Sequence, residues 1–325
     1  MKKIALLLSF VMIQMWGFSQ GTYKVVTGER PVIDLDKVPD DAYEPGKLRI
    51  KLKPQMENMI SDVEINAGKA GYVITGVKSL DALNATYQIS RYEPLLNGIY
   101  QNSPKSVQYR ERHKAWGFHL WFVLETNSKA NIKELVKQFM ALDEVEFAEP
   151  VYKVRLIGEP DSDRDKQGNQ GSTSKWTPND TRYGEQWHYN NTGQQSGTVD
   201  KDIDLPEAWE IEKGHPDVIV CIEDGGIQTN HPDLSANIWS GVGYNFVNNS
   251  STLVAHDHGT HVSGTVAAKN NNSTGVCGVA GGSNSSDGIR LMSCQVFTNS
   301  SSGGFEDAPV YAADNGAAIS QNSWG

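Results

Sequence analysis

An uninterrupted apolar run at residues 218–222 (VIVCI) limits what this chain can fold into more than any other stretch. Such a run, without polar alternation, is typical of a central strand in a parallel sheet that is buried on both faces. It leads into Asp224-Gly225-Gly226, so a carboxylate stands where the strand ends. Open α/β sheets bind their ligands at that end, although turn formation is the more common reason for Asp before two glycines. The run therefore predicts an α/β domain with a candidate functional carboxylate at Asp224.

A histidine block, HGTHVSGT at residues 258–265, follows further along the chain and begins a helical pattern. We expect Asp257 to be the N-cap of this helix. The positive end of a helix favours the neutral form of an imidazole, which is the form that a general base needs. A buried carboxylate beside His258 would stabilise the imidazolium formed later. The alternative without chemistry is a capping or packing histidine.

The same block allows a metal site. His256, His258 and His261 form H-x-H-x-x-H, a spacing that can collect a zinc ion. The pattern resembles part of the metallo-β-lactamase signature, but Thr260 stands where that signature has Asp. A zinc hydrolase is therefore a further hypothesis for this segment.

The N-terminal residues 1–20 have the pattern of a secretory signal peptide. Lys2 and Lys3 precede an apolar stretch at residues 4–12, and the small residues Gly17 and Ser19 fit a cleavage site. An N-terminal anchor helix is the alternative, although this stretch is short for a membrane span. We expect no later transmembrane segment and a secreted, extracellular protein.

Residues 21–157 predict a small α+β domain. Leu48, Ile50 and Leu52 alternate with basic residues as in a half-buried strand, and residues 118–124 are a second strand candidate. Residues 131–142 form an amphipathic helix that Ser128 can cap. Residues 145–152 alternate again, and Pro150 confines that strand to an edge or an end of its sheet. We find no catalytic constellation in this domain.

Residues 158–178 are polar and rich in Gly and Ser, which predicts a linker. In residues 179–325, Val- and Ile-rich strands alternate with helical patterns and Asn/Ser/Gly loops. This alternation predicts a doubly wound, mostly parallel sheet. The predicted fold is thus α/β, preceded by the small α+β domain.

Charge and cysteine content exclude two classes of protein. The formal net charge is −10, and an acidic surface repels phosphate backbones, so nucleic acid is not an expected partner. The three cysteines, Cys221, Cys277 and Cys294, lie in apolar or Gly-rich surroundings. We interpret them as buried small residues, with no disulfide framework.

Three blocks in order resemble the subtilisin-like serine protease family (subtilases). DGGI at 224–227 with HPDL at 231–234 is similar to the family's Asp block, and HGTHVSGT at 258–265 to its His block. NSTGVCGVA at 272–280 resembles the loop after the catalytic helix. The resemblance covers residues 180–325, and AEPVY at 148–152 with the pattern before it resembles the family's propeptide.

The resemblance implies roles for particular residues. Asp224 would orient His258, and His258 would take the proton of a serine nucleophile and return it to the leaving amine. Residues 319–325 (ISQNSWG) resemble the strand that pairs with extended substrate, with Ser323, Trp324 and Gly325 at the specificity pocket. Residues 302–304 would form the opposite wall. The expected partners are protein or peptide substrates, and the propeptide as an intramolecular inhibitor.

The resemblance also implies a structural calcium ion. In the family such an ion binds between the HPDL segment and the post-helix loop, which correspond here to Asp233 and Asn272. Oxygen ligands on an Asn-rich loop suit a hard cation, although the same residues form turns without one. No cofactor is expected for the chemistry itself.

Some features depart from the family pattern. The family's serine block (Gly-Thr-Ser-Met-Ala) and its oxyanion-hole Asn have no counterpart in residues 1–325. We therefore expect negligible peptidase activity from these residues alone, and no cooperative folding of residues 180–325 by themselves. Glu223 stands where the family usually carries an apolar residue. An inactive chain that binds and inhibits another protease is the alternative from a different class.

Overall fold

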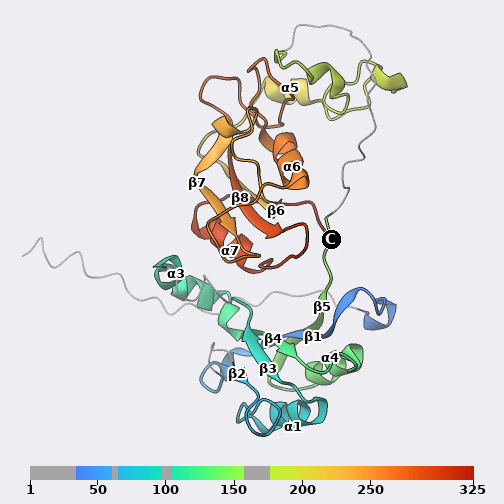
Figure 1. Ribbon diagram of the computed structural model, residues 1–325, viewed down its shortest axis with the longest axis vertical. Coiled ribbons are helices and arrows are strands. Elements are labelled where there is room, and N and C mark those ends of the chain that lie inside the picture. The colour runs from blue at the N-terminus through green and yellow to red at the C-terminus, as the bar shows by residue number, and fades with distance from the viewer. Residues whose placement is uncertain (1–33, 61–64, 97–103, 157–175) are drawn as a thin grey trace, which may run out of the picture. The chain divides into compact units, whose positions relative to one another are not determined.

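The computed structural model describes most of the chain in two compact units, each of which is considered by itself (Figure 1). The described residues are 34–60, 65–96, 104–156 and 176–325. The first unit contains Pro45–Pro94 and Val107–Pro150, and the second contains Pro39–Glu44, Leu95–Ser106 and Val151–Gly325. The predicted signal peptide and residues 158–175 of the predicted linker lie outside the described residues.

The first unit is built on a five-stranded sheet in the order β2-β3-β4-β1-β5. Strand β1 pairs antiparallel with β4, and β3 pairs antiparallel with both β4 and β2. Leu48, Ile50 and Leu52 are fully buried on one face of β1, as the alternation predicts. The elements are β1 (Tyr43–Leu52), β2 (Ile65–Asn66), α1 (Lys78–Tyr87), β3 (Arg91–Pro94), α3 (Pro104–Ala115), β4 (Trp121–Glu125), α4 (Ile132–Met140) and β5 (Val145–Tyr152).

Two predicted element boundaries in this unit are wrong. The N-cap of α4 is Asn131 and not Ser128: the Asn131 side chain accepts a hydrogen bond from the backbone N–H of Glu134 at 3.1 Å. Phe118–Leu120 is a 3-10 turn, so β4 begins only at Trp121. Gly117, with φ 72°, ends the preceding segment in a left-handed conformation, which apolar content alone does not reveal. β5, with Pro150, lies at the sheet edge as predicted.

The second unit contains a four-stranded parallel sheet in the order β7-β8-β6-β9. Helix α6 lies in the crossover from β7 to β8, and α7 lies in the crossover from β8 to β9. The predicted parallel α/β sheet is therefore present (Figure 1). The elements are α5 (Leu205–Trp209), β6 (Ile219–Gly225), β7 (Ile238–Asn245), α6 (Asp257–Ala267), β8 (Arg290–Phe297), α7 (Asp307–Asp314) and β9 (Ile319–Asn322).

Helices cover both faces of this sheet. Val220 and Ile222 of β6 join one apolar cluster with Ala267 of α6. Cys221 of β6, between them in sequence, joins the opposite cluster with Ala308 of α7. Successive residues of a strand point to opposite faces, so the continuous apolar run at 218–222 supplies both cores at once. The sheet is doubly wound for this reason.

The cysteines behave as the sequence predicts. Cys221, Cys277 and Cys294 are free thiols, and all three are fully buried. Among the described residues, no helix is long and apolar enough to cross a membrane.

Candidate active site

The carboxyl end of β6 and the first turn of α6 approach each other closely. Gly226 forms a bridge with Ala255, and the His256 backbone N–H donates to the Gly226 carbonyl at 2.7 Å. A Cβ on Gly259 would lie 2.0 Å from the Gly225 carbonyl oxygen, and a Cβ on Gly226 would lie 2.1 Å from that of Val254. These two contacts are possible only without side chains, which explains the glycines beside Asp224 and His258.

The helix does not begin as predicted. Asp257 is its first residue, and the N-cap is His256. The His256 ring accepts at Nδ1 a hydrogen bond from the His258 backbone N–H at 3.2 Å. His256 thus does what a Ser or Asp side chain usually does at this position, which residue type alone does not suggest.

Asp224 and His258 are in direct contact. His258 Nδ1 lies 2.7 Å from Asp224 Oδ1, and the two residues are 3% and 0% exposed. Asp224 Oδ1 also accepts from the Gly225 backbone N–H at 2.6 Å. Asp224 Oδ2 is buried and has no hydrogen-bond partner among the described residues. The expected proximity of these two side chains is thus observed.

Burial shifts the pKa of the acid in this pair. Removal from water raises the pKa of the Asp224 carboxyl above its ordinary value, and the hydrogen bonds from His258 and from the Gly225 backbone N–H oppose that shift. A carboxylate held against Nδ1 fixes the tautomer that carries its proton there, which makes Nε2 the basic nitrogen. The pair can therefore orient an imidazole base and stabilise it once protonated.

Gln295 contributes to this geometry, although it was not among the predicted site residues. It lies beside Asp224 in the register of β6 and β8 and is 1% exposed. Its Oε1 accepts from the Val254 backbone N–H at 2.9 Å, and its Nε2 donates to the Phe297 carbonyl at 3.0 Å. The amide thereby fixes the segment that leads into His256. A polar amide between Cys294 and Val296, in the largely apolar segment of β8, was the signal that could have identified it.

The segment predicted to bind substrate pairs with another part of the chain. The Arg155 backbone N–H donates to the Gly325 carbonyl at 3.1 Å, and the Gly325 N–H donates to the Arg155 carbonyl at 2.9 Å. Leu156 and Trp324 form an antiparallel bridge. Residues 155–156 thus pair with Trp324 and Gly325 in the way that an added antiparallel strand would.

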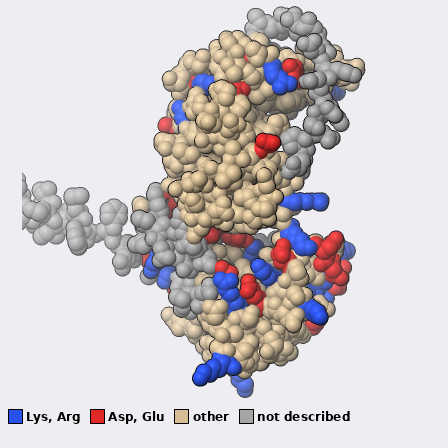
Figure 2. Space-filling model, viewed as in Figure 1, with Lys and Arg blue, Asp and Glu red and all other residues tan. Residues whose placement is uncertain are grey.

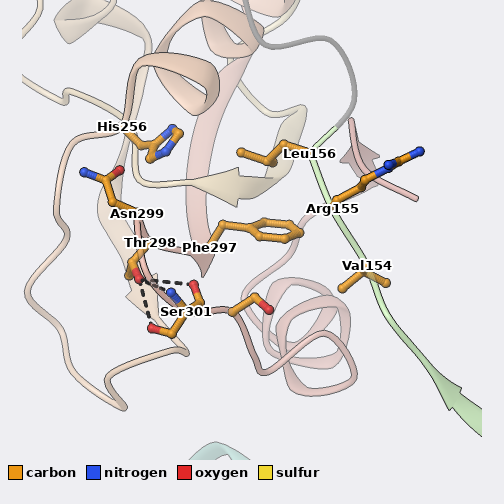
Figure 3. Close-up of a pocket in the computed structure, with 9 residues that line it drawn as sticks. Val154, Arg155, Leu156, His256, Phe297, Thr298, Asn299 and Ser301 are labelled. Carbon is orange, nitrogen blue, oxygen red and sulfur yellow. Dashed lines mark hydrogen bonds between the residues drawn. The ribbon is translucent and has the colours of Figure 1, made fainter. Parts of the chain in front are cut away.

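An open pocket of about 650 Å³ lies beside this pairing (Figure 3). The side chains of Leu156, Phe297 and His256 face it, and Arg155 points away. Ser302 of the predicted opposite wall lines the pocket, but Gly303 and Gly304 do not. The lining residues are Val154, Arg155, Leu156, His256, Phe297, Thr298, Asn299, Ser301 and Ser302.

The residues predicted to bind calcium are next to each other. Asn272 Nδ2 donates to Asp233 Oδ1 at 2.8 Å, and the Val276 backbone N–H donates to Asp233 Oδ2 at 2.9 Å. Burial raises the pKa of the Asp233 carboxyl. As arranged, the two side chains bind each other and offer no shared set of oxygens to a cation, so the arrangement does not fit calcium. The ion stays a prediction, and no step below depends on it.

The zinc hypothesis receives no support from the structure. No three His, Cys, Asp or Glu side chains are grouped so as to hold a metal ion anywhere in the described residues, which include His256, His258 and His261. Two of these rings already have other partners. The His256 ring accepts from the His258 backbone N–H, and the His258 ring contacts the Asp224 carboxylate. Among the described residues, their sequence spacing is therefore not accompanied by a grouping of side chains that could hold a metal ion.

Comparison with known proteins finds a family that part of the chain resembles. Residues 215–325 match the model of the subtilase family. The chain is similar to this family over these residues. It is 31% identical over 199 residues to the thermophilic serine proteinase of Bacillus sp. (strain AK1), covering 60% of this chain and 41% of that protein. It is 35% identical over 154 residues to thermitase of Thermoactinomyces vulgaris, covering 46% of this chain and 48% of thermitase.

A solved protease of Pseudoalteromonas arctica PAMC 21717 matches with 31% identity and a TM-score of 0.33, covering 46% of this chain and 48% of that one. The chain therefore spans less than half the length of each of these three proteins. The Asp and His blocks of this chain, including Asp224 and His258, lie inside the residues that match the family model.

Proposed function

We propose that this chain is part of a secreted serine endopeptidase precursor that hydrolyses peptide bonds through an Asp/His/Ser triad. The observation that carries the proposal is the 2.7 Å contact between His258 Nδ1 and Asp224 Oδ1 at the carboxyl end of β6. Similarity to the subtilase family over residues 215–325 supports the reaction type.

In the proposed reaction, Asp224 orients the imidazole and His258 transfers the proton. Asp224 holds the imidazole with Nε2 basic, so that His258 removes the proton of the serine hydroxyl as it attacks the substrate carbonyl. The imidazolium formed is stabilised by the Asp224 carboxylate and then protonates the leaving amine. Residues 1–325 contain no Gly-Thr-Ser-Met-Ala block, so the proposal takes the nucleophile from outside them.

We further propose that residues 21–157 act as an intramolecular inhibitor. The backbone pairing of Arg155 with Gly325 and of Leu156 with Trp324 supports this, because it occupies the segment that would bind substrate. Ser323, Trp324 and Gly325 would then bind the main chain of a protein or peptide substrate once residues 154–156 leave.

The test uses the longer product encoded when the coding sequence is read past Gly325 into a serine block. In that product, Asp224→Asn should lower kcat about 10⁴-fold, because the imidazole loses the partner that fixes its tautomer. Asp217→Asn is the matched control, since its side chain is 90% exposed, and it should leave kcat unchanged.

Residues 1–325 alone should show negligible hydrolysis in the same assay. A kcat for Asp224→Asn within tenfold of the parent would refute the proposed role of the pair. Tight inhibition of a different subtilase by residues 1–325, without any self-processing of the longer product, would instead favour an inhibitor protein.

A further inference from the structure

Glu223 precedes Asp224 on β6 and lies between two strands. In register it pairs with Cys294 of β8 on one side and with Asn322 of β9 on the other. It is 2% exposed, and its carboxyl group accepts a hydrogen bond from the Ser320 hydroxyl at 2.5 Å. Its backbone carbonyl accepts a hydrogen bond from the Trp324 indole N–H at 2.7 Å. One residue of the central strand therefore holds the C-terminal strand at two points.

The held strand is the same one that pairs with residues 155–156. In the described residues, β9 is the last strand of the sheet and pairs there only with β6, from Val220–Ile319 to Glu223–Asn322. The chain then continues to Trp324 and Gly325, which pair with Leu156 and Arg155. An edge strand with one neighbour is the element of a sheet that separates first.

Glu223 is surrounded by groups that do not neutralise it. Apart from Arg290, the titratable side chains of β6, β8, β9 and α7 are thiols, a phenol and carboxyls, namely Cys221, Asp224, Cys294, Asp307, Tyr311 and Asp314. β9 carries no titratable side chain, and Arg290 lies at the opposite end of β8, in register with Ile219. Burial raises the pKa of the Glu223 carboxyl to about 7, and the hydrogen bond from Ser320 opposes this shift.

We propose that Glu223 is a positioning residue whose uncharged form holds residues 319–325 on the sheet, and that loss of its proton weakens the pairing of residues 155–156 with residues 324–325. A carboxylate between β6 and β9 must be hydrated, because β6, β8, β9 and α7 bring no cation to it, Lys153 donates to the Asp41 carbonyl, and Arg155 points away from the neighbouring pocket (Figure 3). Water reaches it most readily by separation of the edge strand. Trp324 and Gly325 then lose the position in which they accept a paired strand.

The direction with pH follows from linkage. In the paired state the carboxyl keeps its proton up to a pH of about 7, whereas in water it loses the proton near its ordinary value. The pairing is therefore strongest at low pH, weakens as pH rises between about 4.5 and 7, and changes little above that range. If the proposed inhibitor function also holds, neutral pH favours release of residues 154–156; the pH effect itself does not depend on that function.

Hydrogen exchange on the full chain of residues 1–325 tests the proposal, read in peptic fragments that carry the Arg155 and Gly325 amides. Corrected for intrinsic rates, the protection of both amides should fall by up to about tenfold per pH unit between pH 5 and 7 and then level off. In Glu223→Gln, which can still accept from Ser320 but cannot ionise, protection should stay flat over the same range. Asp314→Asn, a matched buried acid on α7, should keep the parent's fall.

Amides of the central strand β8 show whether each variant folds. If Glu223→Gln loses their protection, Ser320→Ala replaces it: without the donor hydroxyl, the pH at which the fall ends should move above 7. A parent chain whose protection does not change with pH, a Glu223→Gln chain that keeps the fall, or an unshifted Ser320→Ala profile would each overturn the proposal. None of these readouts requires peptidase activity, so failure here is distinguishable from failure of the proposed function.

Discussion

The two sheets of this protein differ in where their charged side chains lie and in what partners these side chains have. On the antiparallel sheet of the first unit, Lys47, Arg49 and Lys51 line the face of β1 opposite to its core and pair with Glu125, Glu149 and Glu146 at 3.8, 3.3 and 2.7 Å. Charged side chains crowd this unit in the view of Figure 2. On the parallel sheet of the second unit, both faces are apolar clusters, and Glu223 and Asp224 are the acids of its central strand.

The difference follows from how the charges are paired. On β1 each cation has a carboxylate partner within 4 Å, which offsets the cost of removing it from water; this holds even for Lys51, whose side chain is 4% exposed. A parallel sheet covered by helices on both faces keeps water from the acids within it, so burial raises the pKa values of Glu223 and Asp224. Charges in the second unit are therefore where we expect function, and the paired charges of the first unit are where we expect a structural role.

The largest expected effect comes from cutting the chain between residues 156 and 176. Residues 176–325 alone lack residues 155–156, which leaves the strand after β9 unpaired and apolar surface open to water. We expect this fragment to give no cooperative thermal transition and to aggregate, because parallel pairing depends on non-local contacts. Residues 34–156, with an antiparallel sheet and a core of their own, should melt cooperatively. A sharp two-state melt of residues 176–325 would contradict the comparison.

A core deletion in the first unit should have the next largest effect. Phe139 is fully buried on α4, so Phe139→Ala should lower the free energy of unfolding of that unit by about 3–5 kcal/mol. Met140, the next residue, is 44% exposed, and Met140→Ala should change the free energy of unfolding by less than about 0.5 kcal/mol. Urea denaturation of residues 34–156 measures both. Similar losses for the two variants would show that α4 does not bury the face that the structure assigns to it.

The smallest expected effect is a pH dependence of opposite sign in the two units. Burial lowers the pKa of His113, in the first unit, to about 4. As pH falls from about 6.5 to 4, the unfolded chain protonates this imidazole before the folded chain does, so the first unit loses stability over that range. Burial raises the pKa of Glu223 to about 7 and that of Asp314 to about 6, so the second unit loses stability as pH rises from about 4 to 7. Each group contributes at most about 3 kcal/mol.

Hydrogen exchange of β1 and β8 amides between pH 4.5 and 7 reports the two units separately. His113→Gln should remove the rise in the first unit, and Glu223→Gln combined with Asp314→Asn should remove the fall in the second. If these variants leave both pH profiles unchanged, buried titratable groups do not distinguish the units.

Local patterns were enough to predict several elements and the two candidate site residues. The run at 218–222, the alternation at residues 48–52 and the apolar face of α4 each lie within a few residues, where period and burial are linked directly. Cap positions were less predictable: Asn131 rather than Ser128, and His256 rather than Asp257, begin their helices. Neighbouring polar residues compete for a cap, and the path of the preceding chain decides between them.

The sequence by itself determined the strands at residues 48–52 and 218–222, the amphipathic helix near residues 132–140, and that a carboxylate ends the central strand. Only the tertiary structure decided that β6 lies between β8 and β9, that Asp224 Oδ1 lies 2.7 Å from His258 Nδ1, and that residues 155–156 pair with residues 324–325. The physical reason is that these contacts join segments far apart in the chain. The partners of these segments depend on the strand order and on the close backbone approach at Gly226 and Gly259. Neither can be predicted from a local sequence pattern.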